Sequence, residues 1–352
     1  MINIGIIGAG RIGRVHAETI TKRVPNARLV AIADRSPNAQ KCAWAAEMGI
    51  DRITDNYRDI LERSDIDAVF ICTSTDVHTK YSLEAIAAGK HVFCEKPVAL
   101  TLGEIHQVEE ALKGTNLKYQ VGFNQRLDES FGAIRTAIED GTVGDPYLVR
   151  ITSRDPAPPP VSYIKTSGGL FLDMTIHDFD LSRFLMGCDP VEVMAVGACR
   201  IDPEIGAAGD IDIGVVTLTM ENGAIVTIEN SRQCSYGYDQ RVEVFGSKGM
   251  AYVENQTPTR TTIATSAGII GPKPDGFFLE RYKTAYAEET IRFVDAIEND
   301  REVTAGIRDG LMNAVVGIAA QKAMKERRVV KISEITQQGE TAFSTRFDQS
   351  RL

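Results

Sequence analysis

A glycine-rich turn near the amino terminus restricts the fold of this chain more than any other feature. Apolar residues 2–7 are typical of a strand, and the spacing GxGxxG follows directly as a helix begins. In a dinucleotide-binding unit the first glycine allows the tight turn, the second lets the backbone approach a pyrophosphate, and the third lets helix pack on strand. The helix amino terminus then faces the phosphates. The residues predicted to form this turn are Gly8, Gly10, Arg11, Ile12 and Gly13.

A carboxylate at the end of the next strand favours NAD as the cofactor. Asp34 follows the apolar strand 29–33, about twenty residues after the last glycine, where such folds bind the adenosine ribose hydroxyls. A carboxylate there repels the 2′-phosphate of NADP. Arg35 and Ser36 weaken this inference, because an arginine beside Asp34 can pair with that phosphate. NAD is therefore the prediction and NADP the alternative.

Strands and helices alternate through residue 122, which predicts a doubly wound parallel sheet and a dinucleotide-binding domain over 1–122. Thr73 and Ser74 follow the strand 68–72, so they either line the nicotinamide side of the cofactor or only cap the next helix. The strand 91–94 ends in Glu95, Lys96 and Pro97. That order places a cation at the carboxyl end of a strand, where open sheets bind ligands. We also expect the Lys96–Pro97 peptide to be cis.

The second half has a different pattern, which predicts an α+β domain over 123–335 and a polar tail over 336–352. Successive strands and a turn at 221–223 indicate a large, mostly antiparallel sheet. The strands 193–199 and 213–220 are apolar at nearly every position, so both faces of the sheet should be covered. We expect a partner subunit on the outer face, giving a homo-oligomer, most simply a homotetramer. A second layer from the same chain is the alternative.

A largely apolar helix, expected over 169–186, contains the polar residues Asp173 and His177. Residues four apart share a helix face, and charge in a buried helix needs a partner or a cavity. A structural Asp/His pair would satisfy that need. With Lys96 supplied by the other domain, we favour catalysis: His177 takes the proton of a secondary alcohol, Asp173 orients its ring, and Lys96 stabilises the developing alkoxide. The hydride leaves to the cofactor.

Composition excludes several other classes of protein. The chain has 352 residues, a formal charge of −9 and no block of Lys or Arg, which argues against nucleic acid as a partner. The start of the sequence shows no leader or membrane span, so we expect a cytoplasmic protein without a membrane partner. Six cysteines are scattered without a CxxC pair, and no metal site is predicted.

The first half resembles the glucose-fructose oxidoreductase and inositol dehydrogenase family, Gfo/Idh/MocA. The matching stretches are GIIGAGRIG, the strand ending in Asp34, the segment from Thr73 to His78, and AGKHVFCEKP. In that family the lysine of the EKP motif lies beside the nicotinamide, and a DxxxH pair accompanies it. The resemblance therefore implies Lys96, Asp173 and His177 as the catalytic set. It also implies that Glu95 and Lys96 contact the cofactor together with the glycine turn, Asp34, Arg35, Thr73 and Ser74.

The resemblance is nearest to the inositol 2-dehydrogenases of this family and implies NAD-dependent oxidation of myo-inositol to scyllo-inosose. The segments that carry it surround Gln125, Arg126, Asp155 and Tyr236, which we expect to bind the cyclitol or sugar substrate. Two alternatives stay open. One is a related NAD(P)-dependent dehydrogenase of another inositol isomer, sugar or polyol. The other is a non-catalytic regulator that senses NAD(P), although retention of the three catalytic residues and the lack of a basic segment argue against it.

Overall fold

The computed structural model describes residues 1–50 and 52–337, which form two compact units. Unit 1 contains Met1–Leu127 and Thr284–Ala314. Unit 2 contains Asp128–Lys283 and the chain from Val315 onward. Residues 284–314, which the sequence analysis grouped with the second domain, therefore pack with the first unit. Most of the predicted polar tail, from residue 338, lies outside the described residues.

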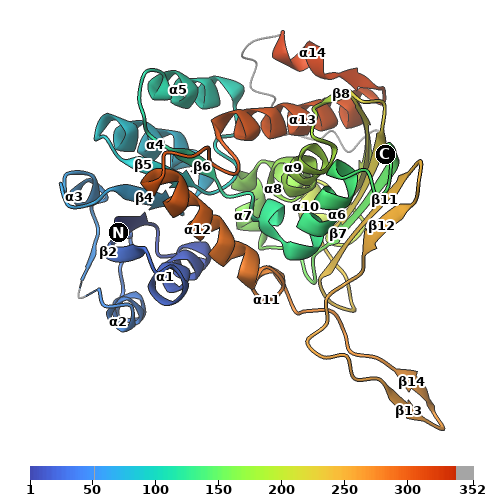
Figure 1. Ribbon diagram of the computed structural model, residues 1–352, viewed down its shortest axis with the longest axis horizontal. Helices are drawn as coiled ribbons and strands as arrows, with labels where there is room; N and C mark the ends of the chain where they lie inside the picture. The colour runs from blue at the N-terminus through green and yellow to red at the C-terminus, as the bar shows by residue number, and fades with distance from the viewer. Residues whose placement is uncertain (51, 338–352) are drawn as a thin grey trace. The chain divides into compact units, whose positions relative to one another are not determined.

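Unit 1 contains a six-stranded sheet in the order β3-β2-β1-β4-β5-β6, and every neighbouring pair is parallel (Figure 1). The chain starts in the middle of the sheet and reverses its direction of growth between β1 and β4, so the carboxyl ends of these strands form the ligand-binding edge of a doubly wound sheet. This confirms the predicted parallel fold. The strands are β1 Ile2–Ile7, β2 Ala27–Ala33, β3 Ile53–Thr54, β4 Ala68–Ile71, β5 His91–Cys94 and β6 Tyr119–Val121.

Helices cover both faces of this sheet because its central strands are apolar on both sides. On one face, Ile4 and Ile6 pack with α1, α2 and α12. On the other face, the missing side chain of Gly5 makes room for Ile60 of α3. The helical elements of this unit are α1 Arg11–Arg23, α2 Ala39–Glu47, α3 Arg58–Leu61, η1 Thr75–Val77, α4 His78–Ala87, α5 Leu102–Leu112, η2 Asn124–Leu127 and α12 Lys283–Glu298.

Unit 2 is organised around a seven-stranded sheet in the order β12-β11-β7-β10-β9-β8-β15. Only β7 and β10 pair in parallel, so the sheet is mostly antiparallel, as expected. The predicted turn at 221–223 joins β9 to β10, and Gly223 adopts a φ of +83° there. The strands are β7 Pro146–Arg154, β8 Pro190–Ala198, β9 Ile213–Met220, β10 Ile225–Ser231, β11 Asp239–Gly246, β12 Met250–Val253 and β15 Val330–Lys331.

The helices of unit 2 differ in one important respect from the sequence expectation. The single helix predicted over 169–186 is two helices, α8 and α9, separated by Met174. The helical segment 278–298 is likewise divided into α11 and α12. The remaining bounds are α6 Glu129–Glu139, α7 Val161–Ser167, α8 Gly169–Asp173, α9 Thr175–Met186, α10 Pro203–Ala207, α11 Phe278–Arg281, α13 Ile307–Glu326 and α14 Ile332–Thr336. Helix α13 begins in unit 1 and ends in unit 2.

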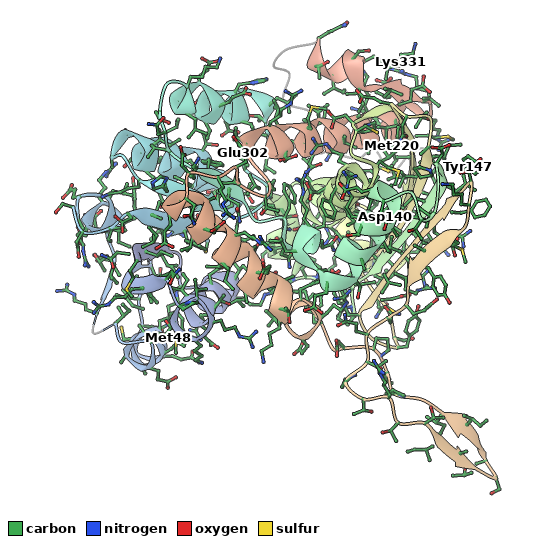
Figure 2. All side chains as sticks on the ribbon, viewed as in Figure 1. Met48, Asp140, Tyr147, Met220, Glu302 and Lys331 are labelled. Carbon is green, nitrogen blue, oxygen red and sulfur yellow. The ribbon has the colours of Figure 1, made fainter. Side chains whose placement is uncertain are left out.

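One face of the unit 2 sheet is packed and the other is open. Helices α6, α8 and α9 lie along the packed face (Figure 1). On the open face, alternate strand residues are exposed or half-buried: Leu148 is 51% exposed, Phe245 46% and Met250 50%. Strand register aligns these three side chains across β7, β11 and β12. The ring of Tyr147, which Figure 2 labels, lies edge-on to that of Phe245. Within the described residues the chain therefore does not cover the second face itself.

A hairpin of strands β13 Ile263–Thr265 and β14 Gly268–Ile270 extends from unit 2 (Figure 1). Every residue of 258–271 is exposed. The sequence analysis did not predict this hairpin, because its alternation of apolar and polar residues is too short to stand out.

Candidate functional site

The three glycines of the first turn have different physical roles. Gly8 has a φ of +107°, and a Cβ there would lie 2.5 Å from the carbonyl oxygen of Cys72. A Cβ on Gly13 would collide with the carbonyl oxygen of Gly8. Both positions therefore need glycine for the fold itself. By contrast, a Cβ on Gly10 would have no heavy atom within 4 Å.

Gly10 precedes α1 without a side-chain cap among the described residues, so the first amides of that helix remain available to an anion. The open space at Gly10 lies on the same turn. These two features fit the pyrophosphate of a dinucleotide. Arg11 and Ile12, the first residues of α1, continue the predicted cofactor turn.

Asp34 lies at the carboxyl end of β2, where three donors hold its carboxylate. The amides of Ala9 and Ser36 each donate to it at 2.9 Å, and the Lys41 ammonium lies 2.6 Å from Oδ1. Burial acts to raise the pKa of Asp34, but the hydrogen bonds from Lys41, Ser36 and Ala9 outweigh it and lower the pKa below 3.8. Asp34 is therefore an anion at the position that the sequence predicts for ribose binding. The sequence pattern drew attention to Arg35 and not to Lys41. Nothing in the sequence marks Lys41 except its positive charge seven residues after Asp34.

Glu95 and Lys96 follow β5 at the same edge of the sheet. Glu95 points into the core, where its Oε1 lies 2.8 Å from Nε2 of His16. A Cβ on Gly122 would lie 3.0 Å from the other Glu95 oxygen, so glycine there leaves room for the carboxylate. The Lys96–Pro97 peptide is cis, which confirms the sequence expectation.

His78, at the start of α4, connects two backbone segments of this edge. Its Nδ1 lies 2.8 Å from the carbonyl oxygen of Pro97, and its Nε2 lies 3.2 Å from that of Thr73. A carbonyl only accepts, so both ring nitrogens donate and the imidazole is charged. Burial acts to lower the pKa of His78, but Cys94 and the two carbonyls outweigh it and raise the pKa to about 9. This buried cation ties the Thr73–Ser74 segment to the residue after Lys96.

Gln125 and Arg126 lie in η2 of unit 1. Gln125 is buried. The Arg126 guanidinium donates to the carbonyl of Thr304 at 2.9 Å and to Asp309 at 2.8 Å. These contacts fix Arg126 within unit 1, and substrate binding by either residue stays a prediction.

In unit 2, Asp173 is held by two partners that sequence reasoning did not find. The Tyr163 hydroxyl donates to Oδ1 at 2.8 Å, and Nη1 of Arg232 lies 3.2 Å from Oδ2. Arg232 is 1% exposed and also lies 3.5 Å from Asp210, so its guanidinium forms ion pairs with two carboxylates. No sequence motif identifies Arg232, which belongs to the segment after β10.

Asp173 and His177 do not lie in one continuous helix, as the sequence pattern predicted. Asp173 ends α8, and His177 is the third residue of α9. Between them Thr175 turns toward β10, and its hydroxyl lies 2.6 Å from Oδ1 of Asn230. This contact with the sheet accounts for the break. Because the two residues lie in different helices, helix periodicity does not predict how their side chains are oriented relative to each other.

A buried acid follows His177 directly. Asp178 is 1% exposed and accepts from the Asn230 amide at 2.7 Å. Burial raises the pKa of Asp178 to about 7, and the charge of Asp155 adds to the effect. Asp155 follows β7, where its amide donates to the carbonyl of Ser231. The predicted substrate residue Asp155 therefore acts electrostatically on a second, partly protonated carboxyl.

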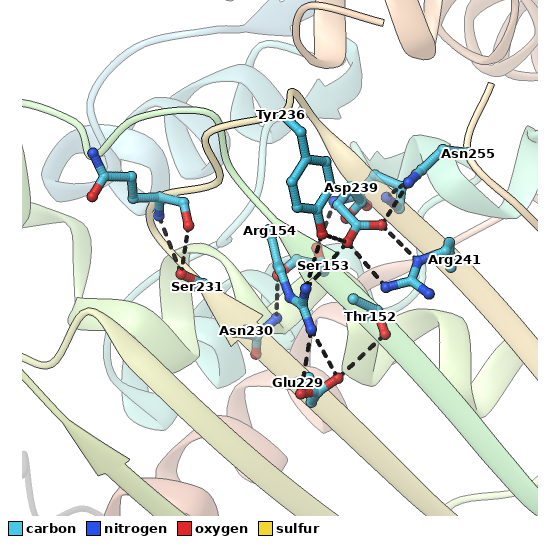
Figure 3. Close-up of polar contacts among 12 residues, drawn as sticks. Thr152, Ser153, Arg154, Glu229, Asn230, Ser231, Tyr236, Asp239, Arg241 and Asn255 are labelled. Carbon is cyan, nitrogen blue, oxygen red and sulfur yellow. Dashed lines mark hydrogen bonds and ion pairs between the residues drawn. The ribbon is translucent and has the colours of Figure 1, made fainter. Parts of the chain in front are cut away.

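Tyr236 belongs to a polar cluster at the end of the sheet (Figure 3). Its hydroxyl lies 2.5 Å from Asp239 and 3.0 Å from the Arg154 guanidinium. Burial, together with hydrogen bonding to Asp239, raises the pKa of Tyr236 to about 12, so its phenol stays neutral. Arg154 continues the cluster to Glu229 of β10 at 3.2 Å.

The described residues contain neither a metal-binding cluster nor a membrane-spanning helix. No group of His, Cys, Asp and Glu side chains there is arranged to hold a metal ion. No helix there combines the length and apolarity needed to cross a membrane.

Two family models match this chain. Residues 2–123 match the model of the GFO_IDH_MocA oxidoreductase family with its NAD-binding Rossmann fold, and residues 131–252 match the GFO/IDH/MocA C-terminal domain.

Three similar proteins cover nearly the whole chain. "Uncharacterized oxidoreductase YrbE" of Bacillus subtilis is 48% identical over 91% of this chain and 93% of its own length. "Myo-inositol 2-dehydrogenase" of Thermotoga maritima is 42% identical over 95% and 99%. The crystal structure of scyllo-inositol dehydrogenase from Lactobacillus casei, with bound NAD(H) and scyllo-inositol, is 34% identical, has a TM-score of 0.87 and covers 95% and 99%. The chain belongs to the Gfo/Idh/MocA oxidoreductase family and carries its NAD-binding Rossmann domain.

Proposed function

We propose that this protein oxidises myo-inositol to the 2-keto compound, scyllo-inosose, with NAD as the hydride acceptor. The observation that carries the proposal is the full-length similarity to a myo-inositol 2-dehydrogenase at 42% identity. The ribose-binding carboxylate and the open glycine turn of unit 1 support the cofactor. The many carboxylates and hydroxyls of unit 2 suit a substrate with several hydroxyl groups.

In the proposed reaction, the bound nicotinamide accepts a hydride from the carbon that bears the reacting hydroxyl. His177 removes the hydroxyl proton as general base, since an imidazole with a pKa near 6.5 works close to neutral pH. Lys96 donates a hydrogen bond to the same oxygen and stabilises its developing negative charge. Asp173, held by Tyr163 and Arg232, is the fixed anion that orients the catalytic groups around it.

The remaining predicted substrate residues have distinct positions. Gln125 and Arg126 are contributed by unit 1, and Asp155 and Tyr236 by unit 2. We assign all four to the hydroxyls that do not react. Such contacts select one stereoisomer, because a buried polar group left without its hydroxyl costs binding energy.

A substrate panel tests the proposed function. Initial rates are measured with myo-inositol, scyllo-inositol, glucose and xylose, each with NAD and NADP. We expect the highest kcat/KM with myo-inositol and NAD. A preference for scyllo-inositol would favour the activity named for the Lactobacillus casei relative. A preference for glucose or xylose would reject a cyclitol substrate.

Two substitutions test the catalytic roles. We expect His177→Ala and Lys96→Ala each to lower kcat at least about a hundredfold while NADH binding survives, as for the loss of acid–base or electrostatic help. Lys113→Ala, at the exposed lysine directly after α5, is the matched control and should keep full activity. Near-normal turnover in either active-site variant rejects the role of that residue.

The open face of the unit 2 sheet supports a homo-oligomer. Val196 is 56% exposed and Tyr252 60% exposed, in addition to the apolar row through Leu148 and Phe245. Exposed apolar side chains gathered on one sheet face are typical of an interface between identical subunits. We propose a homotetramer in which this face forms one of the contacts. Leu148→Glu should lower the mass measured by sedimentation, whereas a monomeric unchanged protein at micromolar concentration rejects the proposal.

We place the protein in the cytoplasm, without a nucleic-acid or membrane partner. The six cysteines are free in the structure, as in a reducing compartment. The net charge of −9 disfavours binding to nucleic acid or to an anionic membrane. Fractionation of cells that express the tagged chain tests this placement, and recovery in the membrane pellet would contradict it.

A further inference from the structure

The ribose-binding carboxylate of Asp34 is partly occupied by its own chain. A carboxylate oxygen has about two acceptor positions. Oδ1 receives the Ser36 amide at 2.9 Å and the Lys41 ammonium at 2.6 Å, so both of its positions are filled. Oδ2 receives only the Ala9 amide, at 2.9 Å, among the described residues. Asp34 can therefore accept one further hydroxyl, although the adenosine ribose presents two.

The second ribose hydroxyl needs another hydrogen-bond partner, and the Lys41 ammonium lies beside Asp34. It has three donors. One goes to Asp34 and one to the carbonyl of Ser36 at 3.2 Å, which leaves one donor without a partner in the described part of the chain. The side chain of Lys41 is only 21% exposed, and Asn38 caps its helix by accepting from the Lys41 amide. The cation is thus held in place rather than free to swing into solvent.

We propose that Lys41 sets the preference of this protein between NAD and NADP. One ribose hydroxyl bonds Oδ2 of Asp34, and the other meets the third donor of Lys41. The same ammonium offsets the repulsion between Asp34 and a 2′-phosphate, so NADP binds more weakly than NAD but measurably. This inference rests on the cofactor site of the proposed function, and it deepens that function by naming the residue that decides cofactor choice.

Lys41 is a stronger candidate than its neighbour Arg35. Arg35 follows Asp34 directly, but its side chain is exposed and acts electrostatically on Tyr81 of α4. Lys41 contacts the Asp34 carboxylate itself. A charge at 2.6 Å affects the local potential far more than an exposed one, which solvent and salt screen.

Equilibrium binding of NADH and NADPH tests the proposal without any inositol. Trp44, the single tryptophan of the sequence, lies in the same helix as Lys41, and energy transfer from its ring to a bound reduced nicotinamide reports binding. We expect Lys41→Met to raise the Kd of NADPH about tenfold or more, because Asp34 then repels the phosphate alone. The Kd of NADH should change by less than about threefold, since Oδ1 of Asp34 becomes free to accept the second hydroxyl.

Two further variants sharpen the result. Lys41→Arg keeps the charge and should keep NADPH binding within about threefold of the unchanged protein. Arg35→Met tests the competing candidate: because Arg35 is exposed, this change should alter the ratio of the two Kd values less than Lys41→Met does. Equal shifts of both cofactors in Lys41→Met, or a larger change of the ratio in Arg35→Met, overturn the proposal.

A measurement on the unchanged protein keeps the proposal testable if a variant fails to fold. The affinity for NADPH should fall more steeply with salt than the affinity for NADH, because the 2′-phosphate pairs with an ammonium. Identical salt dependence, or no detectable NADPH binding, overturns the proposal. If NADH binds as expected but no inositol is oxidised, the proposed substrate fails while the role of Lys41 stands.

Discussion

The cofactor edge of unit 1 and the Asp173 cluster of unit 2 are built in different ways. At the cofactor edge, backbone atoms and short-range contacts dominate: Gly8, Gly13 and the amide of Ala9 lie within a few residues of one another. In unit 2, Asp173 depends on side chains, and its partner Arg232 is 59 residues away in the sequence. The first kind of site can be recognised from spacing, and the second cannot.

The two regions also differ in how their charged side chains are satisfied. Asp34 is partly exposed and is satisfied by amides and one ammonium. Arg232 is enclosed with Asp173 and Asp210, and burial raises the pKa of Asp210 although Arg232 acts to lower it. Removing one member of a buried ion cluster leaves the others uncompensated. Unit 2 should therefore be the more sensitive of the two to a single charge substitution.

The largest expected effect tests that difference directly. Arg232→Met should lower the free energy of unfolding of unit 2 by about 3–5 kcal/mol, because it leaves Asp173 and Asp210 buried without their cation. Hydrogen exchange of unit 2 peptides in increasing denaturant measures the loss. Arg260→Met, at an exposed arginine outside the seven-stranded sheet, is the control and should change stability by less than about 0.5 kcal/mol. If Arg232→Met lowers the free energy of unfolding no more than the control does, Asp173 and Asp210 do not depend on Arg232 for their burial.

The next effect comes from the buried acid beside His177. Burial raises the pKa of Asp178 to about 7, so the folded chain keeps a proton that the unfolded chain releases above about pH 4. Stability of unit 2 should therefore fall between about pH 4 and pH 7, by roughly 2–4 kcal/mol from this group, and stay level above that range.

Asp178→Asn removes this titration and should make unit 2 more stable than the unchanged protein at pH 8, while the two differ little at pH 4. Thermal unfolding at the two pH values checks the sign. The Asn230 contact is a hydrogen bond that an amide oxygen can also accept, which makes asparagine the suitable replacement. An advantage of the variant at pH 4 that disappears at pH 8 would contradict the pKa assignment.

A third prediction concerns the open position in the glycine turn. Gly10→Ala should leave thermal stability nearly unchanged, because the new Cβ meets no heavy atom within 4 Å. It should raise the Kd of NADH at least about tenfold, or 1.4 kcal/mol, because the methyl group occupies the path of the pyrophosphate. Binding is measured by the fluorescence of Trp44.

Gly13→Ala is the matched contrast in the same turn. Its Cβ would collide with the carbonyl oxygen of Gly8, so it should destabilise unit 1 and not merely weaken binding. If both variants lose stability equally, the distinction between a glycine for the ligand and a glycine for the fold is wrong.

The smallest expected effect is at Tyr163. Tyr163→Phe removes one donor to Asp173 and leaves the Arg232 contact in place, so the loss of stability should be about 1 kcal/mol. If Asp173 orients the catalytic groups as proposed, kcat should fall several-fold with little change in NADH binding. An unchanged kcat would show that Arg232 alone is enough to fix the carboxylate.

Two features of unit 2 show what a sequence pattern alone does not decide. The helix predicted over 169–186 is broken at Met174, because Thr175 bonds Asn230 of β10. Likewise, the strands 193–199 and 213–220 are apolar on both sides, yet the structure covers one side only. The hydrophobic pattern of a strand predicts that both of its sides are buried, but it does not identify the chain that buries the second side.

The sequence alone determined the parallel sheet of unit 1, its glycine turn and the position of Asp34, since these follow from backbone geometry over a few residues. It also placed Lys96 at a strand end. Only the tertiary structure decided that Lys41 shares the Asp34 carboxylate, that His78 is a buried cation, and that Arg232 holds Asp173. Partnerships of this kind depend on which side chains the folded chain brings together, and residues far apart in sequence carry no periodic signal of their meeting.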